Sequence, residues 1–573
     1  MKKCFFCILV AIVVSNSLLA QVLVDPNSKF YKDVQIWEVK NLLSNVPNTR
    51  PYSNIVISNI LDTVIEQGSA IDKQKALAWQ ASIQNKDLNV FTKGTYATKI
   101  SNDQNNIYNV HFGVCGDIEI IQNVAFSYDI GTVVQNNSLD KVLPATFSNP
   151  YDDSGDVAKI GSLESVINVN TTFSYDTKHL SLHGGISRFS YGPFYDTSIV
   201  IAPDTYHTGN ITARLYKGSF SYQQSLFALT ASDNRGDASA GFAPGKLMAL
   251  HEIAYTPFSW IKVAYFETIL WKDRFEFSYL LPISYMVGQS LGGFEDNIQM
   301  GLTAQIMPYK GLLWNNQIYV DDISANDILK LDFDTKIIAA FQSQLAWSPL
   351  TSFNKENSFC NLLTLNFMFV NAYMYSHKPT DTDDYNYVNL TTKGEQLSTE
   401  IKPNSYSLTL KAELEPVFNV SLAPFISLTQ HGNVNETITT EEAIQYLSSK
   451  KGAYTTDGSA FNTPFVDKKY IAAYLDDWFF LEQDHIETRL QAGFDSVFDI
   501  ALGAQAKRRG SISVNASYIF EYVHNCMDEA GDMFPGKVSS PDPDDVIASK
   551  QAWVDRLYNA YNNYLRISVK YQY

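Results

Sequence analysis

Long apolar segments are almost absent from the sequence. After residue 20, no apolar run approaches the roughly 20 residues that a membrane-spanning helix needs. Cysteine is also scarce, and beyond the first segment only Cys115, Cys360 and Cys526 remain. Their wide spacing fits neither a disulfide framework nor a zinc site, and it allows at most one disulfide. These absences exclude a helical membrane protein and a disulfide-stabilised domain.

Positive charge is in deficit, and flexible linkers are missing. The formal net charge is −17, which argues against nucleic-acid binding because that function needs a basic surface. No Pro- or Gly-rich linker divides the chain after about residue 90. In contrast, the chain has 34 Tyr, 34 Phe and 8 Trp among many polar residues. This mixture is typical of a β-barrel with a lipid-facing and a water-facing surface, with a large soluble β-protein as the alternative.

The first 20 residues predict a secretory signal peptide. Lys2 and Lys3 form a basic start, residues 5–14 are apolar, and Ala20 precedes a plausible cleavage point. The segment is too short for a membrane-spanning helix. The protein is therefore expected to be exported.

Residues 21–90 predict a small module of three helices. Apolar residues recur at helical spacing in three places, the clearest being Ile57, Ile60, Leu61 and Val64. Pro51 and Ser53 mark the start of that helix. The first helix carries Phe30, Val34 and Trp37, and the third begins at Asp72 as N-cap. Fewer than 60 residues bury little surface alone, so the module is expected to pack on the rest of the chain.

From residue 91 to 573 the apolar period changes from 3.6 to 2. The last strand is the best example, with an apolar set of Leu565, Ile567, Val569, Tyr571 and Tyr573. A polar set alternates with it: Arg566, Ser568, Lys570 and Gln572. The same alternation predicts strands over 363–375, 406–414, 490–504 and 512–522, with a turn at 507–510. We predict an all-β transmembrane antiparallel barrel of about 16 to 20 strands.

The final strand also predicts the orientation of the barrel. If it ends in the periplasm, the long stretches 430–484 and 524–562 face outward, as long outer loops do in such barrels. Both stretches have helix signals, at Thr439 with Glu442 and over 544–563. The terminal aromatic Tyr573 resembles the signal that the barrel assembly machinery reads, which makes that machinery an expected partner.

Seven segments, in the same order along the chain, are similar to the Wzi family of capsule assembly proteins. They are SKFYKDV (28–34), RPYS (50–53), GISRFSYGPFYDTSIVIAP (185–203), HEIAYTPFSWIKVA (251–264), DN (296–297), QIYVDD (317–322) and KPNSYSLTL (402–410). The motif positions are Tyr191, Gly192, Pro193, Asp296, Asn297, Asp321, Asp322, Pro403 and Asn404. Tyr191 replaces the usual Trp and Lys402 the usual Gly. Beyond residue 415 only general barrel character remains.

The resemblance implies a barrel of about 18 strands in the outer membrane, with a largely occluded lumen and the helical module in the periplasm. The implied activity is non-enzymatic binding or organisation of surface polysaccharide. A porin or substrate-specific channel is the first alternative, because a barrel with an open polar bore conducts solutes. An outer-membrane hydrolase is the second.

Candidates for catalysis and metal binding are few. His179, Ser181 and His183 are predicted to share one strand face, but the sequence supplies no orienting acid or oxyanion donors for a hydrolase. Two acidic groups can be weighed as calcium ligands: Asp381, Asp383, Asp384 and Asn386, and then Asp542, Asp544 and Asp545. Both are expected to be solvated loops. We predict no catalytic residue, no metal and no cofactor.

Glycan contacts are expected from aromatic side chains of the outer loops. The candidates are Tyr446, Tyr454, Trp553 and Tyr558. An aromatic ring can stack on a sugar, but it can equally cover the rim of the barrel or meet the membrane interface. Asp321 and Asp322 are adjacent strand residues that point to opposite faces, so they are not expected to act as an acid/base pair.

Overall fold

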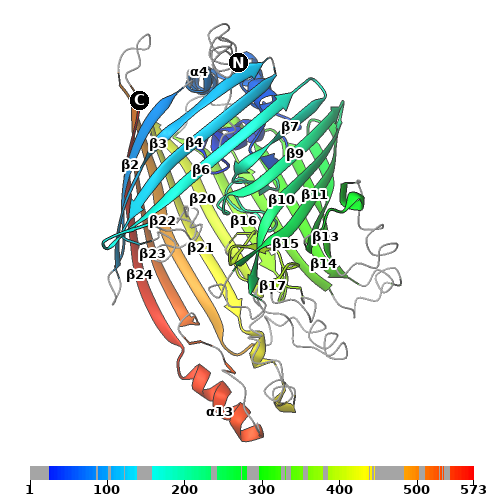
Figure 1. Cartoon of the computed structure of the whole chain (residues 1–573), viewed down its shortest axis with the longest axis vertical. Coiled ribbons are helices and arrows are strands. Elements are labelled where there is room, and N and C mark those ends of the chain that lie inside the picture. The colour runs from blue at the N-terminus through cyan, green and yellow to red at the C-terminus, as the bar shows by residue number, and fades with distance from the viewer. Residues whose placement is uncertain are drawn as a thin grey trace, which may run out of the picture.

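A closed antiparallel β-barrel forms the body of the protein (Figure 1). The computed structural model describes residues 25–573 except for 85–87, 101–104, 122, 138–157, 234–241, 273, 281–295, 324–329, 331–336, 353–358, 378–384, 400, 418, 438, 442–443, 445–482, 503–509, 528–529, 532 and 535–541. The predicted signal peptide therefore lies outside the described residues. No helix in the described part of the chain is long and apolar enough to cross a membrane.

Three helices precede the barrel, as predicted. They are α2 (Lys29–Val39), α3 (Asn54–Gln67) and α4 (Ala70–Gln84). The apolar stripes of the helices meet in one core that includes Phe30, Trp37 and Ile57. The predicted N-cap of the third helix, Asp72, was wrong by three residues, because α4 begins at Ala70. Ser69 precedes the helix and forms a reciprocal pair with Asp72. The Ser69 N–H donates to Asp72 Oδ2 at 3.4 Å, and the Asp72 N–H donates to Ser69 Oγ at 3.3 Å.

Eighteen strands, all within the described residues, close the barrel. The first nine are β2 (Asn89–Ile100), β3 (Asn105–Ile121), β4 (Val124–Gln135), β6 (Leu163–Asp176), β7 (Leu180–Ser187), β9 (Thr208–Lys217), β10 (Phe220–Asp233), β11 (Phe242–Phe258) and β12 (Ile261–Lys272). The others are β13 (Asn297–Tyr309), β14 (Leu312–Ile323), β15 (Ile337–Trp347), β16 (Cys360–Val370), β20 (Ser405–Val417), β21 (Val420–Gly432), β22 (Ile486–Ala501), β23 (Ser511–Cys526) and β24 (Tyr558–Gln572). The last strand pairs with the first, with Gln572 opposite Phe91.

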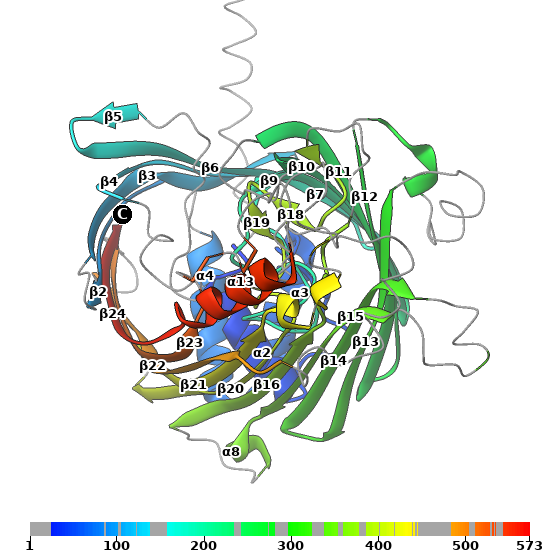
Figure 2. The same ribbon diagram turned by 90° about the horizontal axis from the view of Figure 1, so that it is seen from below.

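Short elements complete the chain. They are β1 (Thr49–Arg50), β5 (Ala158–Ile160), β8 (Ser190–Tyr191), β17 (Tyr385–Asn386), β18 (Thr391–Thr392), β19 (Glu395–Gln396), α8 (Pro349–Ser352), α13 (Pro543–Val554) and the 3-10 turns η2 (Phe277–Leu280) and η4 (Val434–Glu436). The helical module and the C-terminus lie at one end of the barrel, which we call the module end (Figure 1). Helix α13 lies at the other, the α13 end, and crosses the mouth in the view of Figure 2.

Side chains alternate between the two faces of the wall, as the sequence pattern predicts. On β3, Tyr108 and Phe112 are 59% and 50% exposed, whereas Asn109 and His111 between them are 1% and 6% exposed. A soluble protein rarely exposes such a band of large apolar side chains. The outer face is therefore the lipid-facing surface, and the polar set lines the lumen.

Two strand predictions had different outcomes. The single long strand predicted over 490–504 is confirmed as far as Ala501 by β22, which pairs with β23 without a register shift. The Leu502 N–H donates to the Gly510 carbonyl at 2.9 Å. Residues 503–509, with the end of that predicted strand and most of the predicted turn, lie outside the described residues. The strand over 363–375 was wrong at its end, because β16 stops at Val370. Asn371, the position that broke the alternation, begins a segment that turns into the lumen.

Candidate functional site: the barrel lumen

The loop after β7, residues 188–207, folds into the lumen and meets the module there. Strand β8 of this loop pairs with β1, so that Thr49 faces Tyr191 and Arg50 faces Ser190. Two of the segments that resemble the Wzi family, 50–53 and 185–203, are thus brought together by a two-stranded sheet inside the barrel.

Arg50 is the centre of this contact and is 1% exposed. Its guanidinium donates to Ser190 Oγ at 2.9 Å and to the Phe194 carbonyl at 2.5 Å, and it stacks 4.7 Å from the Tyr195 ring centre. A buried guanidinium needs hydrogen-bond partners, and the inner loop supplies two of them together with an aromatic face. The arginine therefore locks the loop to the module.

Tyr191 ties the same loop to the barrel wall. Its hydroxyl donates to Glu252 Oε2 on β11 at 2.8 Å, and Asn48 Nδ2 donates to the same oxygen at 2.7 Å. Lys262 on β12 donates to Asn48 Oδ1 at 2.6 Å. The Wzi-like motif has tryptophan at this position. The tyrosine of this chain supplies a hydroxyl that donates to the buried Glu252 carboxylate.

Gly192 and Pro193 shape the turn after this tyrosine. Gly192 has a φ of +127°, a conformation that side chains disfavour, and its N–H donates to the Asn48 carbonyl at 2.9 Å. A Cβ there would lie 3.1 Å from Gln317 Oε1 on β14. The Pro193 carbonyl accepts a hydrogen bond from Asn315 Nδ2 at 3.2 Å. The motif thus packs the inner loop directly against the wall.

Burial changes the acid–base behaviour of the module where it meets this loop. Burial raises the pKa of Glu38, although the Tyr195 hydroxyl donates to its carboxylate and opposes the shift. Burial also raises the pKa of Tyr52 to about 12. For Asp196, burial favours a higher pKa, but the Lys411 ammonium 2.6 Å away holds it below the usual range. These groups serve the packing of the module against the barrel.

Two segments thus insert into the lumen: the inner loop 188–207 is the first insertion, and residues 371–401, after β16, are the second. Tyr373 and Tyr375 have φ values of +61° and +73° and are almost fully buried. The Tyr375 hydroxyl donates to the Ile199 carbonyl of the first insertion at 2.8 Å, and Asn297 Nδ2 donates to the Val388 carbonyl at 2.9 Å. The two insertions and the wall share one apolar core, which includes Tyr191, Ile199, Tyr319, Met374 and Leu390. The lumen is therefore filled beside β10–β14 and beside the α13-end halves of β15 and β16.

A polar cavity of about 660 Å³ remains on the other side of the lumen. Its lining comes from α2, from the two insertions' flanks and from the inward faces of β2–β6, β15–β16 and β20–β24. Lysines near the module are paired with carboxylates: Lys75 lies 2.6 Å from Glu415 and 3.3 Å from Asp33, and Lys411 lies 3.1 Å from Glu413. This cavity is the candidate site, and the sequence did not predict it. The signal that could have found it was the row of polar residues on the inward face of each strand.

The other family-like positions have structural roles at the α13 end of the barrel. The Asp296 carboxylate accepts from Arg274 and from the Tyr279 hydroxyl. Asp321 lies on the inward face of β14, and at Asp322 the pairing with β15 shifts register, so the simple alternation assumed there is interrupted. Pro403 is buried, and Asn404 enters β20 with a φ of +59° and donates to the Gly432 carbonyl at 2.7 Å.

The aromatic candidates for glycan contact are separated by burial. Trp553 on α13 is fully buried in a cluster with Met533, Phe534 and Val546, which leaves no face of its ring for a sugar. Tyr558, at the start of β24, is 38% exposed. Tyr446 and Tyr454 lie outside the described residues.

The acidic run at 542–545 is not a free loop. Asp542 caps α13, and its carboxylate accepts from the Asp545 N–H at 2.9 Å. In return, the Asp542 N–H donates to the Asp545 carboxylate at 3.3 Å. Asp381, Asp383 and Asp384 lie outside the described residues. Within the described part of the chain, no group of three His, Cys, Asp or Glu side chains is arranged to hold a metal ion.

The candidate hydrolase residues do not form a catalytic pair. His179 precedes β7 and is exposed in a turn, so its predicted place on the strand face was wrong. Ser181 and His183 lie on β7, are 1% and 3% exposed, and make no hydrogen bond to each other among the described contacts. No disulfide joins Cys115, Cys360 and Cys526 in the part of the chain that the structure describes.

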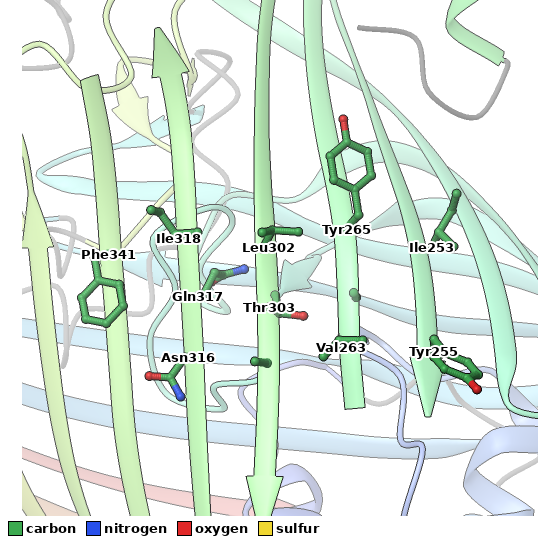
Figure 3. Close-up of a pocket in the computed structure, with 12 residues that line it drawn as sticks. Ile253, Tyr255, Val263, Tyr265, Leu302, Thr303, Asn316, Gln317, Ile318 and Phe341 are labelled. Atoms are coloured by element: carbon green, nitrogen blue, oxygen red, sulfur yellow. The ribbon is translucent and has the colours of Figure 1, made fainter. Parts of the chain in front are cut away.

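A shallow depression of about 420 Å³ lies on the outer wall between β11 and β15 (Figure 3). Its rim carries Ile253, Leu302 and Ile318, which are 36–57% exposed. Asn316 accepts from Ser343 Oγ at 2.9 Å within it. Because these side chains belong to the lipid-facing set, the depression is part of the membrane surface and separate from the lumen cavity.

Comparison with known proteins finds similarity at the level of fold. The structure of Wzi, an outer membrane protein involved in group 1 capsule assembly in Escherichia coli and a carbohydrate-binding β-barrel, has a TM-score of 0.51 and 10% identity, covering 97% of this chain and 99% of that one. The OccD1 (OprD) structure has a TM-score of 0.41 and 10% identity over 86% and 96% of the two chains. For Pseudomonas aeruginosa OccK8 (OprE) the TM-score is 0.40 and the identity 7%, over 86% and 98%.

No protein-family profile and no curated protein sequence matches the chain. At 10% identity the likeness to Wzi concerns the fold: an outer-membrane type of barrel with a Wzi-like architecture. The fold predicted from the sequence is confirmed.

Proposed function

We propose that this protein binds or organises surface polysaccharide in the outer membrane, without catalysis, with its helical module in the periplasm. The observation that carries the proposal is the filling of the lumen by the chain's own insertions. The segments 188–207 and 371–401 form an apolar core with the wall, which suits a holding function better than free diffusion through a wide bore.

The polar cavity supplies the chemistry that sugar binding needs. Amide and hydroxyl side chains such as Asn168, Asn515 and Ser568 line it, and they can both donate to and accept from sugar hydroxyls. The fold similarity to a barrel described as carbohydrate-binding agrees with this proposal. The exposed terminal Tyr573 supports the further proposal that the assembly machinery recognises the last strand.

Binding of the detergent-purified full chain to an array of bacterial surface glycans tests the proposal. We expect selective retention of one class of polysaccharide. A barrel of matched size with an open lumen serves as the control for detergent effects. Uniform background signal across the array would refute polysaccharide binding.

A substrate-specific channel is the second candidate, and the polar cavity is the observation that favours it. A cavity of about 660 Å³ is large enough for a small solute. Uptake of radiolabelled sugars and amino acids into proteoliposomes separates the two functions. Saturable uptake would favour the channel, and binding without uptake would favour the holding function.

A further inference from the structure

Four cationic side chains, Lys93, Lys570, Arg566 and Arg188, gather with the imidazole of His111 on one wall of the lumen cavity. Lys93 on β2 is directly opposite Lys570 on β24 and directly opposite His111 on β3. Arg566 lies four residues before Lys570 on the same inward face, and Arg188 approaches from the first insertion. All five side chains line the cavity. The wall is therefore strongly basic, although the chain as a whole carries a net charge of −17.

Carboxylates lie beside the two arginines of this wall. Asp495 lies 3.7 Å from Arg566, and Asp204 is near enough to Arg188 for their charges to interact. Neither Lys93 nor Lys570 forms an ion pair with a carboxylate in the part of the chain that the structure describes. The strongest charge interactions of Lys93 are with Arg566, Lys570 and Arg188, and all three are repulsive.

The direct pairing of Lys93 with Lys570 costs free energy. Like charges directly opposite each other on neighbouring strands are destabilising, and repulsion is stronger in a lumen partly screened from water. The lysines elsewhere in the cavity show that the fold can supply carboxylates, since Lys75 and Lys411 each contact two. An anion placed between Lys93 and Lys570 would remove the repulsion.

The surroundings of the two lysines fit a sugar ring. The Phe91 ring lies 5.0 Å from Lys570 Nζ and packs against His111, with ring centres 4.8 Å apart. Thr95 and Ser568, on the same strands, add hydroxyls to the cavity lining. Ammonium groups for a carboxylate and hydroxyls for hydrogen bonds thus lie within one compartment.

We propose that Lys93 and Lys570 bind the carboxylate of an acidic sugar residue inside the lumen. The inference rests on the proposed polysaccharide function and specifies it, because it assigns the charge class of the ligand and the residues that select it. It predicts that uronic acid polymers are bound in preference to neutral polymers of the same geometry.

The test compares a trigalacturonate with its fully methyl-esterified form, which has the same rings and linkages without the charge. Calorimetric titration into the full chain in detergent measures both. We expect the charged trimer to bind at least about tenfold more tightly, because charge-assisted hydrogen bonds exceed neutral ones by that order. Raising the salt concentration should narrow the difference.

Lys93→Gln and Lys570→Gln should each weaken binding of the charged trimer about tenfold and leave the ester unchanged. Lys99→Gln is the matched control, since Lys99 lies on the same inward face of β2 but is not part of the cavity lining. Thermal unfolding of each variant without ligand verifies folding. We expect Lys93→Gln to be at least as stable as the unmodified chain, because it removes repulsion.

Each outcome decides a different point. If the charged trimer binds and Lys99→Gln weakens it as much as Lys93→Gln, or if trimer and ester bind equally, the carboxylate site is refuted while polysaccharide binding stands. If inorganic phosphate or acetate binds as tightly as the trimer, the site is a general anion site and the sugar assignment is refuted. If neither trimer binds and the glycan array is also blank, the proposed function fails together with this inference.

Discussion

At the scale of single residues, buried polar contacts hold the module and the inner loop in place. Asp72 is the clearest case in the module, because its carboxylate accepts from the Lys40 ammonium at 2.7 Å, from Trp37 Nε1 at 3.2 Å and from Ser69 Oγ at 2.7 Å. It thereby joins the end of α2 to the start of α4. Burial alone would raise the pKa of Asp72, but Lys40 and Ser69 together bring it below its usual value.

Asp72→Asn is predicted to destabilise the module by about 1–3 kcal/mol, since it removes the charge that Lys40 faces and weakens two further hydrogen bonds. Hydrogen-exchange protection of residues 29–84 measures the change. Asp62→Asn, at an exposed position on α3, is the control and should have little effect.

The same carboxylate predicts a pH dependence. The native pKa of Asp72 is lower than that of the unfolded chain, about 3.9, so its stabilisation is present above that value and is lost as the pH falls through the native pKa. Protection factors, corrected for intrinsic exchange rates, should fall on acidification in the unmodified chain and less in Asp72→Asn. Equal acid sensitivity in both would contradict this account.

Tyr191→Phe is predicted to loosen the inner loop. The variant keeps the ring but deprives Glu252, which is 2% exposed, of one of its donors, at a cost of about 1–3 kcal/mol. Exchange protection over 188–207 should decrease. Tyr222→Phe, which removes a weaker 3.3 Å bond on the outer face of β10, should change stability by less than about 0.5 kcal/mol. An unchanged loop in Tyr191→Phe would show that the hydroxyl is not needed.

At the scale of elements, alternation along each strand separates lipid from lumen. Ile426 and Ser427 are neighbours on β21, but Ile426 is 47% exposed on the outer face and Ser427 lines the cavity. Ile426→Lys should cost about 2–4 kcal/mol because it places a charge against lipid. Ser427→Lys should cost less, because its ammonium can reach water in the cavity. Urea unfolding in lipid vesicles measures both, and equal costs would contradict the assignment of faces.

The sequence predicted the strands well where one face is apolar and the other polar. The last strand and the uninterrupted β22 follow from parity alone, because a strand with period 2 has only two faces. The helices of the module were found for the same kind of reason, from a stripe at spacing 3.6. The error at Asp72 arose because Ser69 and Asp72 are both polar residues that can cap the first turn of α4, and Ser69 is the one that precedes the helix.

The inward course of the two insertions could not be predicted in this way. Tyr373 and Tyr375 continue the parity of β16, so their apolar side chains were assigned to the lipid face. In the structure the chain turns at Asn371 and buries them in the lumen. The burial of these two tyrosines in the lumen depends on the apolar core formed with distant segments such as 188–207, and the local sequence pattern does not indicate that core. The cavity between those segments and β24–β2 was missed for the same reason.

At the scale of the whole molecule, the barrel encloses two different compartments. Beside β10–β14 and the α13-end halves of β15 and β16 the insertions form a packed apolar core, and beside β20–β24 and β2–β6 the cavity is polar and lined with charges. Both compartments are built by the same chain, so the module and insertions act as an internal plug. We therefore propose that the barrel holds a ligand and does not form a wide bore.

Single-channel recording on the purified full chain in a planar lipid bilayer tests that claim most directly. A porin with an open polar bore, recorded under the same salt and voltage, provides the reference conductance. We predict no steady large-conductance state, because the two insertions fill the lumen beside β10–β14 and the α13-end halves of β15 and β16. Large, steady pores comparable to those of the porin would contradict the plugged lumen and favour a channel.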